Sequence, residues 1–241
     1  MTRSRSILNA RRRLPLWVPF LLALTFTTAC NFNRSKTPAT NNGNTSSHGT
    51  AFTPSSDARK DLREALERLK TAFPYRLTES SSGTADGRDL PAGTRVVEFA
   101  TADRTHTTWT NGPAGNSELI TIGDQRYSRS NNGSWTVGSL PGLAQRQAME
   151  KRMREMMESA FKDVQYVGID TINGVPCHAY TYTMEMDLSG KKSTATGKAW
   201  IGSSDGFPRQ IDSETTIGSF KQKSHITYEF NADFKVEKPV M

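Results

Sequence analysis

The succession of alternating segments after Pro74 is the feature that most constrains how this chain can fold. Apolar and polar residues alternate there in short runs, and turn residues at 131–133 and 173–174 separate the runs. Alternation with a period of two predicts half-buried strands, and Asn-Gly pairs have the backbone freedom that tight hairpins require. The strands predicted from Val164 onward follow one another directly. The sequence therefore predicts an antiparallel meander that must curl or close to protect its edges.

Two stretches with helical periodicity accompany the predicted sheet. In the first, apolar residues recur at helical spacing from Leu62 to Phe73, while charged residues occupy the other face. We expect Ser55 or Ser56 to cap the start of this helix and Pro74 to end it. The second helical stretch separates two groups of strands. Together, these elements place the chain in the mainly β, α+β class.

The second helical stretch, residues 141–162, carries an unusual apolar face. Four methionines and one phenylalanine recur on it: Met149, Met153, Met156, Met157 and Phe161. Methionine is flexible and polarizable, which suits a surface that repacks around variable apolar ligands, but a methionine stripe is also common core material. The face therefore either lines a ligand cavity or fills the concavity of the sheet. Both interpretations remain open at this point.

The N-terminal segment has the pattern of a bacterial secretory signal. Five arginines precede an apolar run from Leu14 to Phe26, which is too short for a membrane-spanning helix of about 20 residues. A cysteine, Cys30, follows small residues at the end of this run. We expect residues 1–29 to be removed and Cys30 to carry acyl chains that hold the protein at a membrane surface. The alternative is an ordinary secretory signal with an incidental cysteine.

The composition of the remaining chain separates a tether from a folded domain. Residues 30–56 are rich in Asn, Thr, Ser, Gly and Pro, and they cannot bury enough apolar surface to offset the entropy lost on ordering. We expect them to form a flexible tether and residues 57–241 to form one domain. Without the five leader arginines, 26 of the 31 Lys and Arg residues remain against 24 Asp and Glu. This nearly neutral balance, with no basic stripe, argues against nucleic-acid binding.

The candidate catalytic patterns in the sequence have simpler structural explanations. The four histidines are scattered, and no two have metal-ligand spacing. Gly202 to Gly206 match the Gly-x-Ser-x-Gly pattern of serine hydrolases, but a predicted strand follows where a helix is required, so we expect a hairpin turn. Cys177 and His178 are neighbours on a predicted strand and point to opposite faces, so we expect Cys177 to be structural. We therefore predict no enzyme, no cofactor and no metal.

Several strand and turn motifs in the second half of the chain resemble those of a known superfamily. The motifs are Tyr166-Val167-Gly168, Asn173-Gly174-Val175-Pro176-Cys177, Lys198-Ala199-Trp200-Ile201, Asp205-Gly206-Phe207-Pro208-Arg209 and Tyr228-Glu229-Phe230-Asn231-Ala232-Asp233-Phe234. They resemble the C-terminal half of the LolA/LolB-like lipoprotein-carrier superfamily, in particular its exported lipoproteins of the LppX and LprG type. The resemblance implies a curved, half-open antiparallel barrel with helices packed in its concavity and an apolar cavity for acyl chains. It transfers no individual ligand-binding residue.

The sequence favours a membrane-anchored lipoprotein of the cell envelope that binds a lipid or another acylated or apolar ligand. We expect the methionine face and Phe161 to contact this ligand, with Trp200 and Phe207 as further candidates. Burial of apolar surface would drive binding at roughly 25 cal/mol per Å². The rival hypothesis is a non-enzymatic interaction or scaffold module that uses the same fold with a sealed core. The sequence indicates neither the identity of the ligand nor a protein partner.

Overall fold

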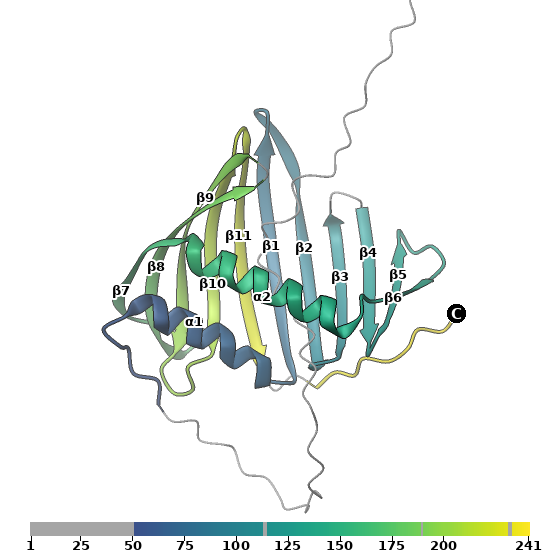
Figure 1. Ribbon diagram of the computed structural model, residues 1–241, viewed down its shortest axis with the longest axis horizontal. Helices are drawn as coiled ribbons and strands as arrows, with labels where there is room; N and C mark the ends of the chain where they lie inside the picture. Colours follow the sequence, from purple (N-terminus) through teal and green to yellow (C-terminus); the bar gives the residue numbers. More distant parts are fainter. Residues whose placement is uncertain (1–50, 113–114, 189, 231–232) are drawn as a thin grey trace, which may run out of the picture.

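The computed structural model describes residues 51–112, 115–188, 190–230 and 233–241. The eleven strands in these ranges form one antiparallel sheet with the order β6-β5-β4-β3-β2-β1-β11-β10-β9-β8-β7 (Figure 1). The strands are β1 (Tyr75–Ala85), β2 (Arg88–Thr101), β3 (Arg104–Gly112), β4 (Gly115–Ile122), β5 (Gln125–Ser130), β6 (Thr136–Ser139), β7 (Phe161–Ile172), β8 (Val175–Leu188), β9 (Lys191–Gly202), β10 (Pro208–Ile217) and β11 (Phe220–Phe230). Strands that follow each other in the chain pair to form two meanders, one from β1 to β6 and one from β7 to β11. The pairing of β1 with β11 joins the two meanders. The predicted antiparallel, mainly β architecture is confirmed.

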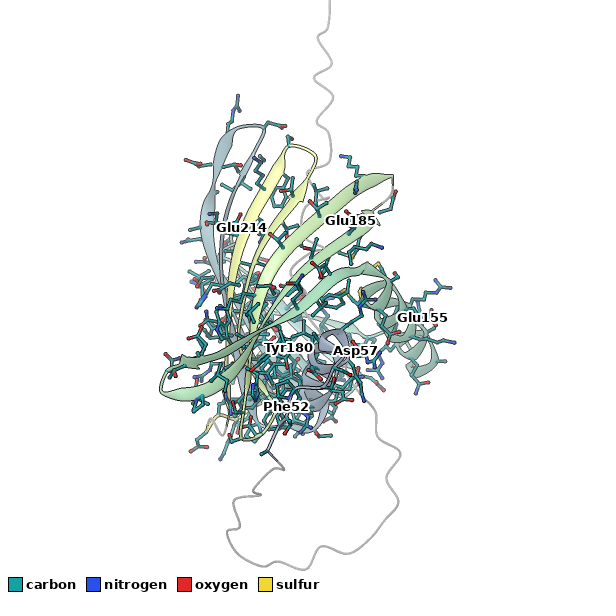
Figure 2. The ribbon with its side chains drawn as sticks, turned by 90° about the vertical axis from the view of Figure 1, so that its left-hand side faces the viewer. Phe52, Asp57, Glu155, Tyr180, Glu185 and Glu214 are labelled. Carbon is teal, nitrogen blue, oxygen red and sulfur yellow. The ribbon has the colours of Figure 1, made fainter. Side chains whose placement is uncertain are left out.

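The sheet is open because its two edge strands, β6 and β7, do not pair with each other. The helix α2 (Leu143–Ala160) connects these edges by crossing one face of the sheet (Figure 1). The helix α1 (Ala58–Arg68) and the short 3-10 helix η1 (Leu69–Thr71) precede β1, and α1 lies on the same face as α2. Figure 2 shows the sheet curving around this side. The fold is therefore the half-open barrel with helices in its concavity that the sequence predicts.

The start of α1 differs in detail from the prediction. Asp57, and not Ser55 or Ser56, is the N-cap, because its carboxylate accepts a hydrogen bond from the amide of Lys60 at 3.1 Å. Ser55 instead donates its own amide to the carboxylate of Asp61 at 3.0 Å. Ser and Asp are both strong N-cap residues, so propensity alone could not distinguish these neighbours.

A buried carboxylate fixes α1 to the sheet. Tyr180 of β8 donates its hydroxyl to Asp61 at 2.9 Å, and both residues are buried. Burial raises the pKa of Tyr180, and its hydrogen bond to Asp61 adds to the shift, so the phenol remains a donor at neutral pH. Figure 2 shows Tyr180 close to α1. Leu62 and Ala65, on the same side of α1, pack into the core beside this contact.

Two apolar clusters fill the helix-covered side of the sheet, which we call the helix face. The larger cluster joins α1 and the end of α2 to β8 and β9, and it includes Leu62, Met157, Tyr182, Met184 and Ile201. The second lies on β1, β2 and β11 and includes Leu69, Tyr75, Leu77, Val97 and Ile226. Phe52 also belongs to the larger cluster, so the packed region extends beyond the predicted boundary at Asp57.

The C-terminal tail covers part of the opposite side, which we call the outer face. Phe234 and Val236 pack there against Ile120 of β4 and Tyr127 of β5. The guanidinium of Arg104 donates to the backbone carbonyl of Val236 at 3.3 Å, which holds the tail against β3. The sheet therefore carries apolar clusters on both faces, and a different part of the chain covers each.

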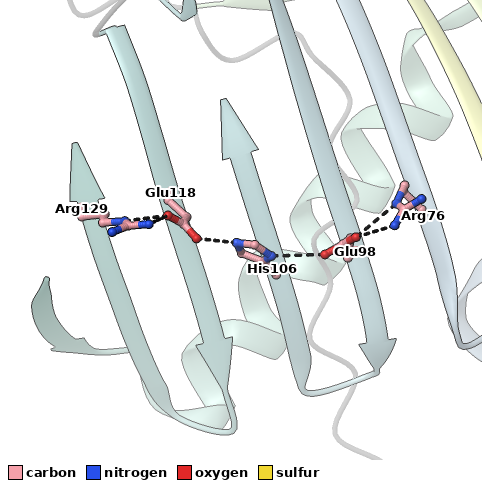
Figure 3. Close-up of polar contacts among 5 residues, drawn as sticks. All are labelled: Arg76, Glu98, His106, Glu118 and Arg129. Atoms are coloured by element: carbon pink, nitrogen blue, oxygen red, sulfur yellow. Dashed lines mark hydrogen bonds and ion pairs between the residues drawn. The ribbon is translucent and has the colours of Figure 1, made fainter. Parts of the chain in front are cut away.

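A chain of charges crosses the outer face (Figure 3). Arg76 lies 2.7 Å from Glu98, and His106 bridges Glu98 at 3.2 Å and Glu118 at 2.8 Å. Arg129 donates to Glu118 at 2.6 Å. Burial alone would raise the pKa of Glu118, but the hydrogen bonds from Arg129 and His106 outweigh it and lower the pKa below its usual value. These contacts join five neighbouring strands, and such cross-strand pairs support the register of a sheet.

Candidate functional site

An apolar pocket of about 290 Å³ opens between α1 and α2 above β1 and β2. Its buried wall includes Leu69, Tyr75, Phe99 and Met157. Its exposed rim includes Arg59, Arg63, Glu67 and Glu158. The pocket is concave, largely apolar inside and charged at the mouth, which is the general character of a small-molecule site.

Aromatic rings form the floor of this pocket. Tyr75 and Phe99 are paired across β1 and β2, and their rings stack with centroids 4.4 Å apart. Phe73 stacks against Tyr75 at 5.7 Å. Because the backbone register places Tyr75 and Phe99 side by side on the helix face, the floor is a broad apolar surface before any ligand arrives.

The structure brings three of the five residues of the predicted methionine face to this pocket. Met153, Met157 and Phe161 line it, with Met157 buried and Met153 41% exposed. Met149 is 61% exposed and Met156 is half-buried, and neither lines the pocket. The helix α2 approaches the core near its C-terminal end, so helical spacing alone could not show which methionines reach the cavity.

The two further candidates lie elsewhere. Trp200 is on the outer face, where its ring packs with Cys177 and its indole nitrogen donates to Asp170 at 2.9 Å. Phe207 stacks on Phe230 with centroids 4.9 Å apart. Neither side chain lines the pocket between the helices.

A smaller cavity of about 60 Å³ lies deeper beneath α1 and shares Leu66 and Phe161 with the pocket. One end of it is polar, because Glu79, Ser224 and Tyr228 line it. Ser224 donates its hydroxyl to Glu79 at 2.7 Å. Burial raises the pKa of Tyr228. The concavity therefore changes from apolar near the helices to polar toward the middle of β1 and β11.

A buried ion pair lies at this polar end. The guanidinium of Arg95 lies 2.7 Å from the second carboxylate oxygen of Glu79, and the two residues are only 8% and 3% exposed. Burial lowers the pKa of Arg95, and the neighbouring Glu79 opposes that shift. This pair was not among the residues that the sequence predicted for the site. One feature of the sequence pointed to the burial of Glu79: it alternates with Tyr75 and Leu77 along the predicted strand, and alternate residues of a strand share a face.

The outer face has a larger but different hollow. It has a volume of about 890 Å³, and hydroxyl and charged side chains such as Thr181, Lys198, Asp212 and His225 line it. Several of its polar groups already pair with each other: His225 lies 2.6 Å from Asp212, and Lys223 lies 2.9 Å from Glu214. Glu214 points away from the helices in Figure 2. This polar surface does not suit an apolar ligand.

The patterns examined for catalysis have structural roles. Residues Gly202 to Gly206 form the turn between β9 and β10, as predicted, and not a strand-to-helix elbow. Cys177 is fully buried, and burial raises the pKa of its thiol. His178 faces the other way, lying 3.1 Å from the carbonyl of Phe52. Within the described ranges, no group of three or more His, Cys, Asp and Glu residues could hold a metal ion.

The predictions for the N-terminal segment concern residues outside the described ranges. They are the signal at residues 1–29, acylation of Cys30 and most of the tether at 30–56. Among residues 51–241, apart from the gaps given above, no helix has the length and apolar character needed to cross a membrane.

Comparison with solved structures identifies the fold. No protein-family model matches the sequence, and no curated protein sequence matches it. The lipoprotein LppX of Mycobacterium tuberculosis superposes with a TM-score of 0.51 at 17% identity, over 75% of this chain and 98% of LppX. LprF of Mycobacterium bovis gives 0.45 at 11% identity over 79% and 100% of the two chains. A LolA superfamily protein of Nitrosomonas europaea gives 0.34 at 11% identity over 75% and 96%. The fold shared with LppX confirms the resemblance at the level of architecture.

Proposed function

We propose that this protein is a cell-envelope lipoprotein that binds the acyl chain of a lipid or lipoprotein in the pocket between α1 and α2. The observation that carries the proposal is the open apolar pocket of about 290 Å³ in the concavity of the half-barrel. A sealed core, which the scaffold hypothesis requires, would leave no such space because protein interiors are close-packed. The flexible side chains of Met153 and Met157 at the pocket suit ligands of different shape.

Burial of the chain would supply the binding energy. Each methylene group that leaves water contributes about 0.8 kcal/mol, whereas association costs roughly 4–15 kcal/mol in lost freedom of motion. Since ten methylenes contribute only about 8 kcal/mol, a ligand must bury on the order of ten or more of them to offset this cost, which favours long acyl chains over short ones. Tyr75 and Phe99 support each other by ring stacking, which reduces the cost of ordering the site.

Attachment to a membrane is the second part of the proposal. The sequence predicts an acylated Cys30 followed by a tether, which would let the domain reach lipids near the bilayer to which it is anchored. The fold shared with LppX, which is itself a lipoprotein, supports this assignment. Replacing Cys30→Ser should release the protein into the soluble envelope fraction or leave it unprocessed. A Cys30→Ser protein that is cleaved to the same size and stays in the membrane would contradict the anchor.

Binding can be tested with a matched pair of methionine variants. Met153→Glu places a carboxylate at the pocket, whereas Met149→Glu makes the same change on the same helix outside it. Both positions are exposed enough to tolerate charge, so both variants should fold. We expect Met153→Glu to weaken binding of a fluorescent long-chain fatty acid about tenfold or more, because the chain would have to desolvate the new charge. Met149→Glu should bind as the wild type does.

Two results would contradict the acyl-chain proposal. One is the absence of measurable binding by the wild-type protein after extraction of any lipid that co-purifies. The other is equal affinity in Met153→Glu and the wild type, which would place the ligand elsewhere on the molecule. Thermal melting of all three proteins shows whether either substitution has damaged the fold.

A further inference from the structure

Two arginines lie one helical turn apart on the rim of the proposed acyl pocket. Arg59 and Arg63 both project from α1, both are exposed, and both line the pocket together with apolar Leu66 on the same helix. Residues separated by four positions are neighbours on a helix surface, so the two guanidinium groups share one side of α1. An apolar pocket with paired cations at its mouth has the layout of an amphiphile site.

The surrounding residues leave this positive charge largely uncompensated. Arg59 makes one long hydrogen bond, 3.4 Å from its Nη2 to the carbonyl of Lys162. In the part of the chain that the structure describes, the side chain of Arg63 has neither a hydrogen bond nor an ion pair. Glu67 follows Arg63 by one turn but lies 2.6 Å from Lys70. Glu158 is the remaining acid on the described rim, so cations outnumber anions there.

Local electrostatics make this pair of arginines well suited to an anion. Like charges at positions i and i+4 destabilise a helix, and an anion bound between them would relieve the repulsion. The planar guanidinium fork also matches carboxylate and phosphate oxygens and forms short, charge-assisted hydrogen bonds with them. An anionic head group held at this rim would leave its chain free to enter the apolar space beside Leu66 and Met157.

We propose that the pocket selects amphiphiles with an anionic head group, a carboxylate or a phosphate, which Arg59 and Arg63 bind while the acyl chain occupies the interior. This inference rests on the proposed acyl-chain function and adds the class of ligand to it. The free carboxylate of a fatty acid and the phosphate of a phospholipid share the chemistry that the two arginines recognise. The experiment must therefore compare both with a neutral head group on the same chain.

Three fluorescent probes that share the same polyene chain meet this requirement. They are cis-parinaric acid, its methyl ester, and the phosphate monoester of the corresponding alcohol. We expect the wild-type protein to bind at least one of the two anions about tenfold more tightly than the ester. The double variant Arg59→Gln with Arg63→Gln should lose that preference and keep its affinity for the ester. Retained binding of the ester also shows that the variant is folded.

A control with the same loss of charge separates head-group recognition from general electrostatics. Lys60→Gln with Arg126→Gln removes two cations from positions outside the pocket lining and should preserve the preference for anions. A preference for the carboxylate or for the phosphate in the wild type would show which source of anion fits better. Equal affinity of the wild type for all three probes would overturn the inference and leave acyl binding intact. Failure to bind any probe would overturn the proposed function as well.

Discussion

The two halves of the sheet are covered from opposite sides. On β8 and β9, the helix face is packed beneath α1 and the end of α2, with Leu62 and Met184 in its core. On β4 and β5, the buried apolar cluster lies on the outer face beneath the C-terminal tail. The pocket lies between these regions, above β1 and β2, where Tyr75 and Phe99 face the gap between the helices. The pocket thus lies where packing of the chain against the helix face gives way to packing against the outer face.

A difference between the two faces of the sheet also appears in their ion pairs. Glu79 and Arg95 are almost completely buried on the helix face, whereas Glu118 and Arg129 are partly exposed on the outer face. A buried charge that loses its partner has no water to replace it, but an exposed charge does. The helix face should therefore be far more sensitive to the loss of one charge.

The largest expected effect comes from removing the buried carboxylate. Glu79→Ala should lower the free energy of unfolding by about 3–5 kcal/mol, because it leaves Arg95 charged and unpaired in the core. Glu118→Ala should cost no more than about 1 kcal/mol. Urea denaturation of both variants gives the comparison. If the two changes were equally costly, the distinction between a buried ion pair on the helix face and an exposed one on the outer face would be wrong.

A double variant that removes both charges shows whether the unpaired charge causes the loss of stability in Glu79→Ala. Glu79→Leu combined with Arg95→Met should be more stable than Glu79→Ala, since no unpaired charge remains. If the double variant is no more stable, the loss in Glu79→Ala comes from packing and not from the charge.

A smaller effect is expected at the tail. Val236→Ala should lower the free energy of unfolding by about 1–2 kcal/mol, because it removes apolar contact with Ile120 and Tyr127 on the outer face. Binding of a fluorescent fatty acid should be unchanged, because the tail covers the face opposite the pocket. Loss of fatty-acid binding in Val236→Ala would show that the two faces are coupled.

The smallest effect concerns acid sensitivity of the outer face. The pKa of Glu118 is lower in the folded protein than in the unfolded chain, so its stabilising contribution is present above the unfolded pKa and is lost as the pH falls through the folded value. Thermal melting between pH 7 and about pH 3 should show Glu118→Gln losing slightly less stability than the wild type over that interval. Identical losses would mean that Glu118 contributes nothing to the pH dependence.

Sequence pattern predicted the architecture because alternation and turn residues are local signals. The meander between Val164 and Phe230 and the turn at Gly202 to Gly206 follow directly from them. The alternation of apolar and polar residues continues into the C-terminal tail at Phe234, Lys235 and Val236, but residues 233–241 form no strand, so periodicity could not predict their position on the outer face. The placement of the tail depends on contacts between residues such as Val236 and Ile120 that are far apart in the chain.

The candidate site was predictable only in part, for a related reason. Helical spacing identified Met153, Met157 and Phe161, which do line the pocket, but it could not separate them from exposed Met149. Periodicity defines the sides of a helix, whereas the depth of each residue depends on how the helix crosses the sheet. The charged rim was missed because residues such as Arg63 on the polar side of a helix are ordinarily only solvated.

Photochemical labelling tests the central claim most directly. A long-chain fatty acid with a diazirine near its terminal methyl group can be equilibrated with the delipidated protein, irradiated and mapped by peptide mass spectrometry. We predict adducts on residues of the pocket such as Leu66, Met153 and Met157, and competition by unlabelled fatty acid. Adducts confined to the polar hollow of the outer face around Thr181 and His225, or the absence of competed labelling, would contradict an acyl site between α1 and α2.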